Sequence, residues 1–217
     1  SVEIVSPGQP FPLQYTSIQL RPDEDGDVHM SCIQRGVTAF PVDPAGGARL
    51  DLFAEDPAYS LRVISLGRRR FPFYGHKYDE VVLSAHGFVG FSIEDVMAAS
   101  AGLLRADLPT QLAARRISLL FTDELAPGWG GGEVSHVITE SSLIITWDGV
   151  PSNRNVLSDT NSMQLQLFFD GSVQMTYLEV ATARTYRAVG VSDGRGMGAS
   201  GFVAGSFQHA ESVSCQP

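Results

Sequence analysis

The sequence is short of positive charge. Its 217 residues include 15 Lys and Arg against 24 Asp and Glu, so the formal net charge is −9 at pH 7. Proteins that bind DNA or RNA need a basic face to replace the counterions of the phosphates, and the charge argues against that class. The sequence also lacks a run of about 18 apolar residues, so we expect no membrane-spanning helix.

Cysteine is scarce. Cys32 and Cys215 are the only two, and their wide separation excludes a CxxC redox motif or a CxxC zinc site. Charged residues make up only 18% of the chain, a composition that indicates a secreted or cell-surface protein. In that setting we predict a disulfide between the two cysteines, with two unpaired thiols as the alternative.

Apolar residues, in contrast, make up 43% of the chain, enough for a hydrophobic core. No linker rich in proline or serine divides the sequence, so we predict one domain over 1–217, with an N-terminal strand and loop in 1–28. Residues 1–3 lack the features of a signal peptide, and we expect them to follow a cleavage site or an upstream domain.

Strand patterns dominate the sequence. The segment 117–121 is nearly all apolar, as in a strand buried on both faces. Many short strands separated by turns predict an all-β fold, an antiparallel two-sheet sandwich or jelly roll. The principal runs lie at 13–20, 61–66, 81–83, 88–91, 117–121 and 143–147.

The clearest local prediction is a β-hairpin over 163–178. Apolar residues alternate with Gln, Ser and Thr on both sides of Asp170-Gly171. This pattern predicts a type I′ turn, which needs positive φ at both central residues. The Gln and Thr face is expected to be exposed.

A short helical insertion is expected within 92–116. Ser92 fits the N-cap and Asp95 the third helical position, a capping box with Asp in place of Glu. A second helical turn is expected at 110–115. Three apolar residues of the first helix would share its buried face: Ile93, Val96 and Met97.

Several motifs follow one another in a characteristic order. An FPFYG run at 71–75 precedes the strand at 81–84, the ISLLF run at 117–121 and a closing VGVSDG run at 189–194. In this order they resemble an uncharacterised secreted bacterial β-sandwich domain, distantly similar to the nidogen-type extracellular domain. The resemblance covers about 30–195.

This resemblance implies an accessory module of an exported protein, and it implies no catalytic residues, because none is established for the family. The sequence departs from the family pattern in two places. His86 stands where an Asn-Gly turn is usual. Two acidic clusters of the family are reduced here to 55–56 and 123–124, which argues against carrying over a calcium role.

Three residues are predicted to bind a ligand. Trp129 lies in a glycine-rich loop, where an indole is suited to contacting sugar or protein. Arg69 belongs to the single basic run and suits a carboxylate or sulfate-rich partner. His136 lies in a predicted edge strand. The structural alternatives are a Trp folded over a sheet edge, a solvated turn and a solvent-facing histidine.

Calcium is the one cofactor that the sequence suggests. Asp23, Asp25 and Asp27 resemble part of an oxygen-ligand loop, although the twelfth position, which would carry Glu, is Gln34. The alternative is a solvated acidic turn. The acidic pair at 123–124, near the glycine-rich loop, is a second candidate with the same alternative.

Signatures of catalysis are absent. The sequence contains no GxSxG elbow and no HExxH motif. Glycosidases need two carboxylates across a cleft, and no local cluster supplies them. The carboxylates and tryptophans considered for sugar chemistry are Glu133, Glu140, Asp148, Glu179, Trp129 and Trp147.

The sequence therefore favours a non-catalytic extracellular accessory, adhesive or assembly domain of an exported bacterial protein. Its partner would be a protein or a glycan at the cell surface, and homo-oligomerisation stays open. A carbohydrate-binding module that uses Trp129 as an aromatic platform is the alternative, followed by a glycoside hydrolase.

Overall fold

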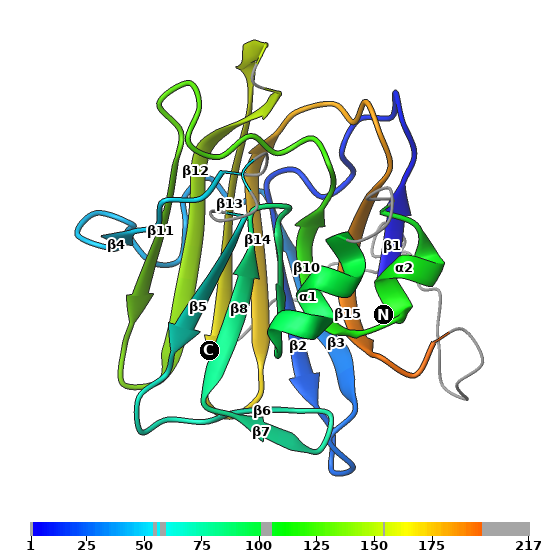
Figure 1. The fold of residues 1–217 in the computed structure, drawn as a ribbon, viewed down its shortest axis with the longest axis vertical. Coiled ribbons are helices and arrows are strands. Elements are labelled where there is room, and N and C mark those ends of the chain that lie inside the picture. Colours follow the sequence, from blue (N-terminus) through cyan, green and yellow to red (C-terminus); the bar gives the residue numbers. More distant parts are fainter. Residues whose placement is uncertain (1, 54–55, 57–59, 101–105, 154, 197–217) are drawn as a thin grey trace.

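Two antiparallel sheets pack face to face in the computed structural model (Figure 1), which describes residues 2–53, 56, 60–100, 106–153 and 155–196. The predicted all-β sandwich is confirmed. The six-stranded sheet has the order β1 (Val2–Val5), β15 (Arg187–Asp193), β10 (Arg115–Phe121), β9 (Phe88–Gly90), β8 (Glu80–Ser84) and β5 (Leu61–Ser65).

The second sheet has seven strands, and a small separate hairpin accompanies the two sheets. The order of the second sheet is β3 (Val28–Arg35), β2 (Thr16–Pro22), β14 (Val173–Val180), β13 (Val156–Phe168), β12 (Ser142–Asn153), β11 (Glu133–Ile138) and β4 (Ala48–Arg49). The separate hairpin joins β6 (Phe71–Phe73) and β7 (His76–Tyr78).

Early strands pair with late strands in both sheets. Strand β1 pairs with β15, and β2 pairs with β14. Residues 1–28 therefore hold two strands, whereas the sequence predicted one. The extra strand, β1, was missed because it is only four residues long and has Glu3 in the middle, so it shows no extended apolar run.

The core lies between the sheets. Met163, Met175 and Trp147 are fully buried in it. Tyr177 on β14 crosses the core and donates its hydroxyl hydrogen to the carbonyl oxygen of Leu119 on β10, at 2.7 Å. Burial at both faces of 117–121 is confirmed.

Two short helices cover the outer face of the six-stranded sheet (Figure 1). In α1 (Ile93–Ser100), the Ser92 hydroxyl accepts the Asp95 N–H at 3.0 Å, as predicted. Of the three residues predicted to share a buried face, Val96 alone is buried, and it packs directly over Gly90, where a Cβ would lie 2.6 Å from it. The predicted shared buried face is therefore wrong for its other two members, which are exposed: Ile93 and Met97.

The second helix, α2 (Leu108–Leu112), begins before the predicted turn at 110–115. Asp107 is its N-cap, and the Asp107 carboxylate accepts the Thr110 N–H at 2.9 Å. Pro109 fits the first turn because no N–H is needed there. The helix ends before Arg115, where β10 starts.

The hairpin between β13 and β14 is confirmed, but its turn is not type I′. Gly171 has φ +96°, whereas Asp170 is not among the described non-glycine residues with positive φ. The Gly171 N–H bonds to Phe168 O, and the Phe168 N–H bonds to Ser172 O, both at 2.9 Å. These bonds are those of a type I turn followed by a glycine bulge, which Asp-Gly suits equally well.

The Gln and Thr face of this hairpin is largely buried, contrary to expectation. Gln164 and Thr176 are each only 1% exposed. Val42, from the segment before β4, crosses this face and bonds to the Gln164 amide through both backbone groups, at 3.2 and 2.7 Å. Gln164 also donates to Thr146 at 2.8 Å, so its polar atoms are satisfied within the protein.

Candidate functional site

Three connections meet at one end of the sandwich (Figure 1). They are the loop 122–132 between β10 and β11, the tip of the β12–β13 hairpin, and the loop 181–186 between β14 and β15. The Ala126 N–H donates to Pro151 O at 2.9 Å, which joins the loop to the hairpin tip. Because these segments form one surface, we call them the loop end.

Trp129 lies on the loop end with 42% of its surface exposed. Gly128 and Gly130 on either side have positive φ and pack closely against other residues. A Cβ on Gly130 would lie 2.9 Å from Pro151 and 3.0 Å from Leu157, so the loop rests directly on the hairpin. Leu157 is itself 47% exposed. The indole thus belongs to a packed loop and has an exposed apolar neighbour.

A buried ion pair fixes the base of the loop end. Arg187 Nη2 and Nε donate to Glu124 Oε2 at 3.0 and 3.2 Å, and both side chains are more than nine-tenths buried. The Arg184 N–H also donates to Glu124, at 3.0 Å. Burial lowers the pKa of Arg187, and the Glu124 charge opposes that shift. The loops 122–132 and 181–186 are therefore joined through one carboxylate.

Further polar contacts join the three segments of the loop end. Arg184 donates to Asp159 on β13 at 2.5 Å, and Thr185 donates to Asp123 at 2.6 Å, which joins the two loops. Asn161 on β13 donates to Val150 O at 2.9 Å and accepts the Ala181 N–H at 3.2 Å. Sequence reasoning missed these partners, because they are far apart in the chain and no local pattern marks them.

The three predicted ligand-binding residues do not lie together. Trp129 is at the loop end, whereas Arg69 lies between β5 and β6, at the opposite end of the molecule (Figure 1). The Arg69 guanidinium lies 5.7 Å from the Phe169 ring centre. His136 lies on β11, and its Nδ1 is 3.2 Å from Ala48 O.

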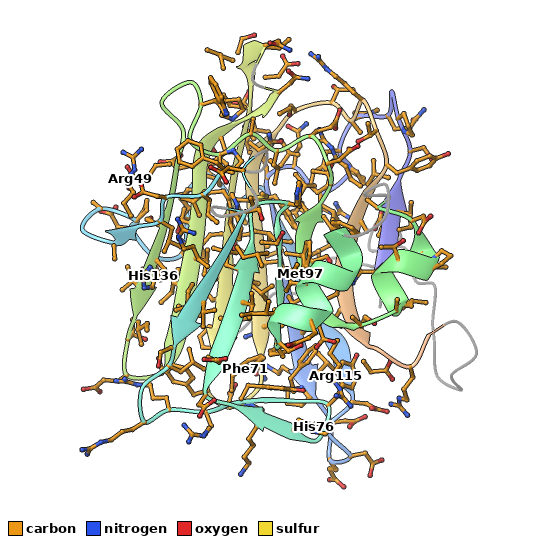
Figure 2. The ribbon with its side chains drawn as sticks, viewed as in Figure 1. Arg49, Phe71, His76, Met97, Arg115 and His136 are labelled. Carbon is orange, nitrogen blue, oxygen red and sulfur yellow. The ribbon has the colours of Figure 1, made fainter. Side chains whose placement is uncertain are left out.

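The strand that holds His136 is not at the edge of its sheet. Strand β4 pairs with it, so Arg49 and His136 lie on neighbouring strands (Figure 2). Strand β4 has only two residues and no apolar pattern, so no strand was predicted there. The predicted edge position of β11 is therefore wrong, although the His136 side chain is only half-buried.

The residues considered for sugar chemistry are also dispersed. Trp147 is fully buried and has no surface available for stacking. Glu133 and Asp148 are exposed partners across β11 and β12. Glu140 lies in the turn at the other end of that hairpin, and Glu179 is exposed on β14. Trp129 is thus the one member of this set that offers an exposed ring.

The acidic turn between β2 and β3 is held by its own backbone. The Asp23 carboxylate accepts the N–H groups of Asp25 and Asp27 at 3.0 and 2.9 Å. Asp27 lies 3.6 Å from the guanidinium of Arg195. Within the described residues no group of three or more His, Cys, Asp or Glu side chains is arranged to hold a metal ion, and calcium binding here stays a prediction.

The predicted disulfide also stays a prediction. Cys32 lies on β3 and is 6% exposed, whereas Cys215 lies outside the described residues.

Comparison with known proteins gives one match. The family model described as NIDO related matches residues 40–216. No curated protein and no solved structure matches the chain. In the part of the chain that the structure describes, no helix has the length and apolar character needed to cross a membrane. The family match covers most of the sequence and agrees with the sandwich fold, so the chain belongs to the NIDO-related family, whose domains are extracellular and generally non-enzymatic.

Proposed function

We propose that this domain is a non-catalytic adhesive or accessory module of an exported bacterial protein, and that it binds its partner through the loop end. The observation that carries the proposal is the exposed Trp129 on a packed loop. Tryptophan is strongly enriched among the residues that dominate binding energy at protein interfaces. Here it has Leu157 beside it and a buried ion pair beneath the loop.

The rigidity of the loop end supports this proposal. Glu124, Asp159 and Asn161 each join two of its segments by hydrogen bonds. A surface that is ordered before binding loses little conformational entropy when its partner docks. Loops positioned by a rigid sandwich are also the usual place for recognition residues.

A glycan is the second candidate partner. Tyr186, in the loop next to the Arg184–Asp159 pair, is 51% exposed. Trp129 and Tyr186 thus place two exposed aromatic rings on connected loops of the loop end. Aromatic faces of this kind are suited to stacking on the apolar faces of sugar rings.

The test compares Trp129→Ala with Met97→Ala, a matched loss of an exposed apolar side chain on α1 (Figure 2). The full chain and both variants are screened against a glycan array and against cell-surface proteins. We expect Trp129→Ala to weaken binding about tenfold or more, with an unchanged melting temperature. Met97→Ala should bind as the original chain does. Equal binding by all three would refute the loop end as the site.

Assembly is tested separately by size-exclusion chromatography with light scattering, with and without EDTA. A large assembly would favour a role in building a surface structure, and its loss in EDTA would support the calcium site at Asp23, Asp25 and Asp27. A monomer indifferent to EDTA would support an accessory binding module.

A further inference from the structure

A buried arginine lies on the outer face of the six-stranded sheet, beneath the helices. Arg116 on β10 is only 1% exposed. Its guanidinium carbon lies 5.0 Å from the Phe88 ring centre and 5.3 Å from that of Phe121. The two rings meet edge to face, with centres 4.9 Å apart. This position favours the cation through its contact with the aromatic rings, but aromatic rings accept no conventional hydrogen bonds.

Several hydrogen-bond donors in this region find no acceptor among the described residues. Arg116 Nε and Nη1 are buried without a hydrogen-bond partner there, and so is Gln111 Nε2 on α2. Gln111 is 0% exposed, and its Oε1 accepts a hydrogen bond from Ser118 Oγ at 2.6 Å. With the amide oxygen facing Ser118, both hydrogens of Gln111 Nε2 are directed to another acceptor.

The strand register and the ring contacts place the unpartnered donors over the same part of the sheet face. Ser118 is two residues beyond Arg116 on β10, so both side chains lie on the same face of the strand. The bulge of β10 comes only after Ser118 and does not change this. Phe88 is the direct cross-strand partner of Ser118. Because the Arg116 guanidinium lies over the Phe88 ring, it reaches the level of Ser118, where Gln111 is bonded.

The charge of Arg116 makes the missing acceptors costly. Burial lowers the pKa of Arg116 to about 10, so the side chain stays cationic at neutral pH. Asp95 on α1 is the acidic residue whose charge opposes that shift, but it does not accept a hydrogen bond from Nε or Nη1, which have no partner in the part of the chain that the structure describes. A buried cation whose donors are unmet is strongly unfavourable, so a further negative group would stabilise the fold.

We infer that Arg116 and Gln111 bind a small inorganic anion, of the size of a halide, between β10 and α2. Arg116 Nε and Nη1 and Gln111 Nε2 donate to it. The ligand is small because both side chains are buried to 99% or more, and a larger ion would have to displace the helix. The site is distinct from the loop end and does not depend on the proposed function.

Thermal unfolding of the full chain in sodium chloride and in sodium gluconate, at equal ionic strength, tests the inference. Gluconate is too large to enter the site. We expect the melting temperature to rise with chloride concentration and to saturate, since a ligand that binds only the folded state stabilises it. The matched control Arg68→Met, at an exposed arginine, should keep the response to chloride.

The second variant to test is Gln111→Glu. The new glutamate carboxylate would supply the negative charge from within the protein. This variant should fold and lose the response to chloride. A crystal soaked in bromide should show anomalous scattering beside Arg116. Equal melting curves in both salts, together with no bromide beside Arg116, would overturn the inference and leave water as the acceptor.

Discussion

His86 shows how one buried side chain makes stability depend on pH. It is 6% exposed in the turn between β8 and β9, and its Nδ1 has no hydrogen-bond partner among the described residues. Burial lowers the pKa of His86, although a hydrogen bond with the Thr122 backbone and the charge of Asp123 act in the other direction. The folded state therefore holds His86 neutral at a pH where the unfolded chain would protonate it.

We predict that this histidine destabilises the protein in mild acid. The stability that depends on a neutral His86 is fully present above the unfolded pKa of about 6.5. It is lost as the pH falls toward the lowered pKa of the folded state. His86→Asn, which restores the Asn-Gly turn usual in the family, removes the titration. Chemical unfolding from pH 7.5 to 5 should show the original chain losing more stability than the variant. Parallel pH profiles would contradict the prediction.

The buried Arg187–Glu124 pair should contribute more to the free energy of unfolding than the partly exposed Arg184–Asp159 pair. Glu124→Gln leaves the buried Arg187 charge unpaired, and we expect a loss of about 3 kcal/mol or more in the free energy of unfolding. Asp159→Asn breaks the Arg184 pair, whose side chains are 46% and 38% exposed, and should cost about 1 kcal/mol at most. Urea unfolding measures both, and equal losses would contradict this ranking.

At the residue scale, sequence reasoning succeeded where the local context was decisive. The glycines around Trp129 suggested an indole available for contact, and the side chain is 42% exposed, while its role as a ligand-binding residue stays a prediction. Glu124 was considered only as a calcium ligand, because Arg187 is 63 positions away and nothing local links the two. Trp147 looked equally suited to sugars, yet its strand packs it into the core.

At the element scale, a substitution at Gly171 tests the geometry of the β13–β14 turn. Gly171 has φ +96°, and a Cβ there would lie 3.1 Å from Pro72 O. We expect Gly171→Val to lower the free energy of unfolding by about 1 kcal/mol or more. Gly67→Val is the matched control, because Gly67 also has positive φ but a Cβ there would meet nothing within 4 Å. Thermal melts should show the larger loss at Gly171, and an unchanged melting temperature for Gly171→Val would contradict the turn geometry.

The elements were easier to predict than their details. Alternation located the hairpin, and the capping box located α1, because both signals are local. The turn type depended on which residues of β13 and β14 pair, and Asp-Gly is compatible with either turn. The exposure of Ile93 and Met97 depended on Gly90 beneath α1, a contact between elements that helical periodicity does not contain.

At the scale of the whole molecule, we predict that the Cys32–Cys215 disulfide ties the last residues of the sequence to β3. Peptide mapping without reduction should recover the linked peptide, whereas two alkylated thiols would contradict it. Cys32→Ser should then lower the free energy of unfolding by about 4 kcal/mol, the value expected from loop-closure entropy for so long a loop. The melting temperature of the original chain should fall on reduction, and that of the variant should not.

The sandwich itself followed from the strand pattern, but the order of its strands did not. Periodicity states which residues face a core and says nothing about which strands are neighbours. The pairing of β2 with β14 joins residues more than 150 positions apart, and the sequence marks neither partner for the other.

The pairing of early strands with late strands in both sheets has a consequence for biosynthesis. During synthesis β1 and β2 leave the ribosome well before their partners β15 and β14. Both sheets are therefore completed only after β14 and β15 have been made, and such non-local pairing is slow compared with local contacts. A clone begun at residue 40, where the family match starts, would omit β1, β2 and β3, and β14 and β15 would each become an edge strand of its sheet.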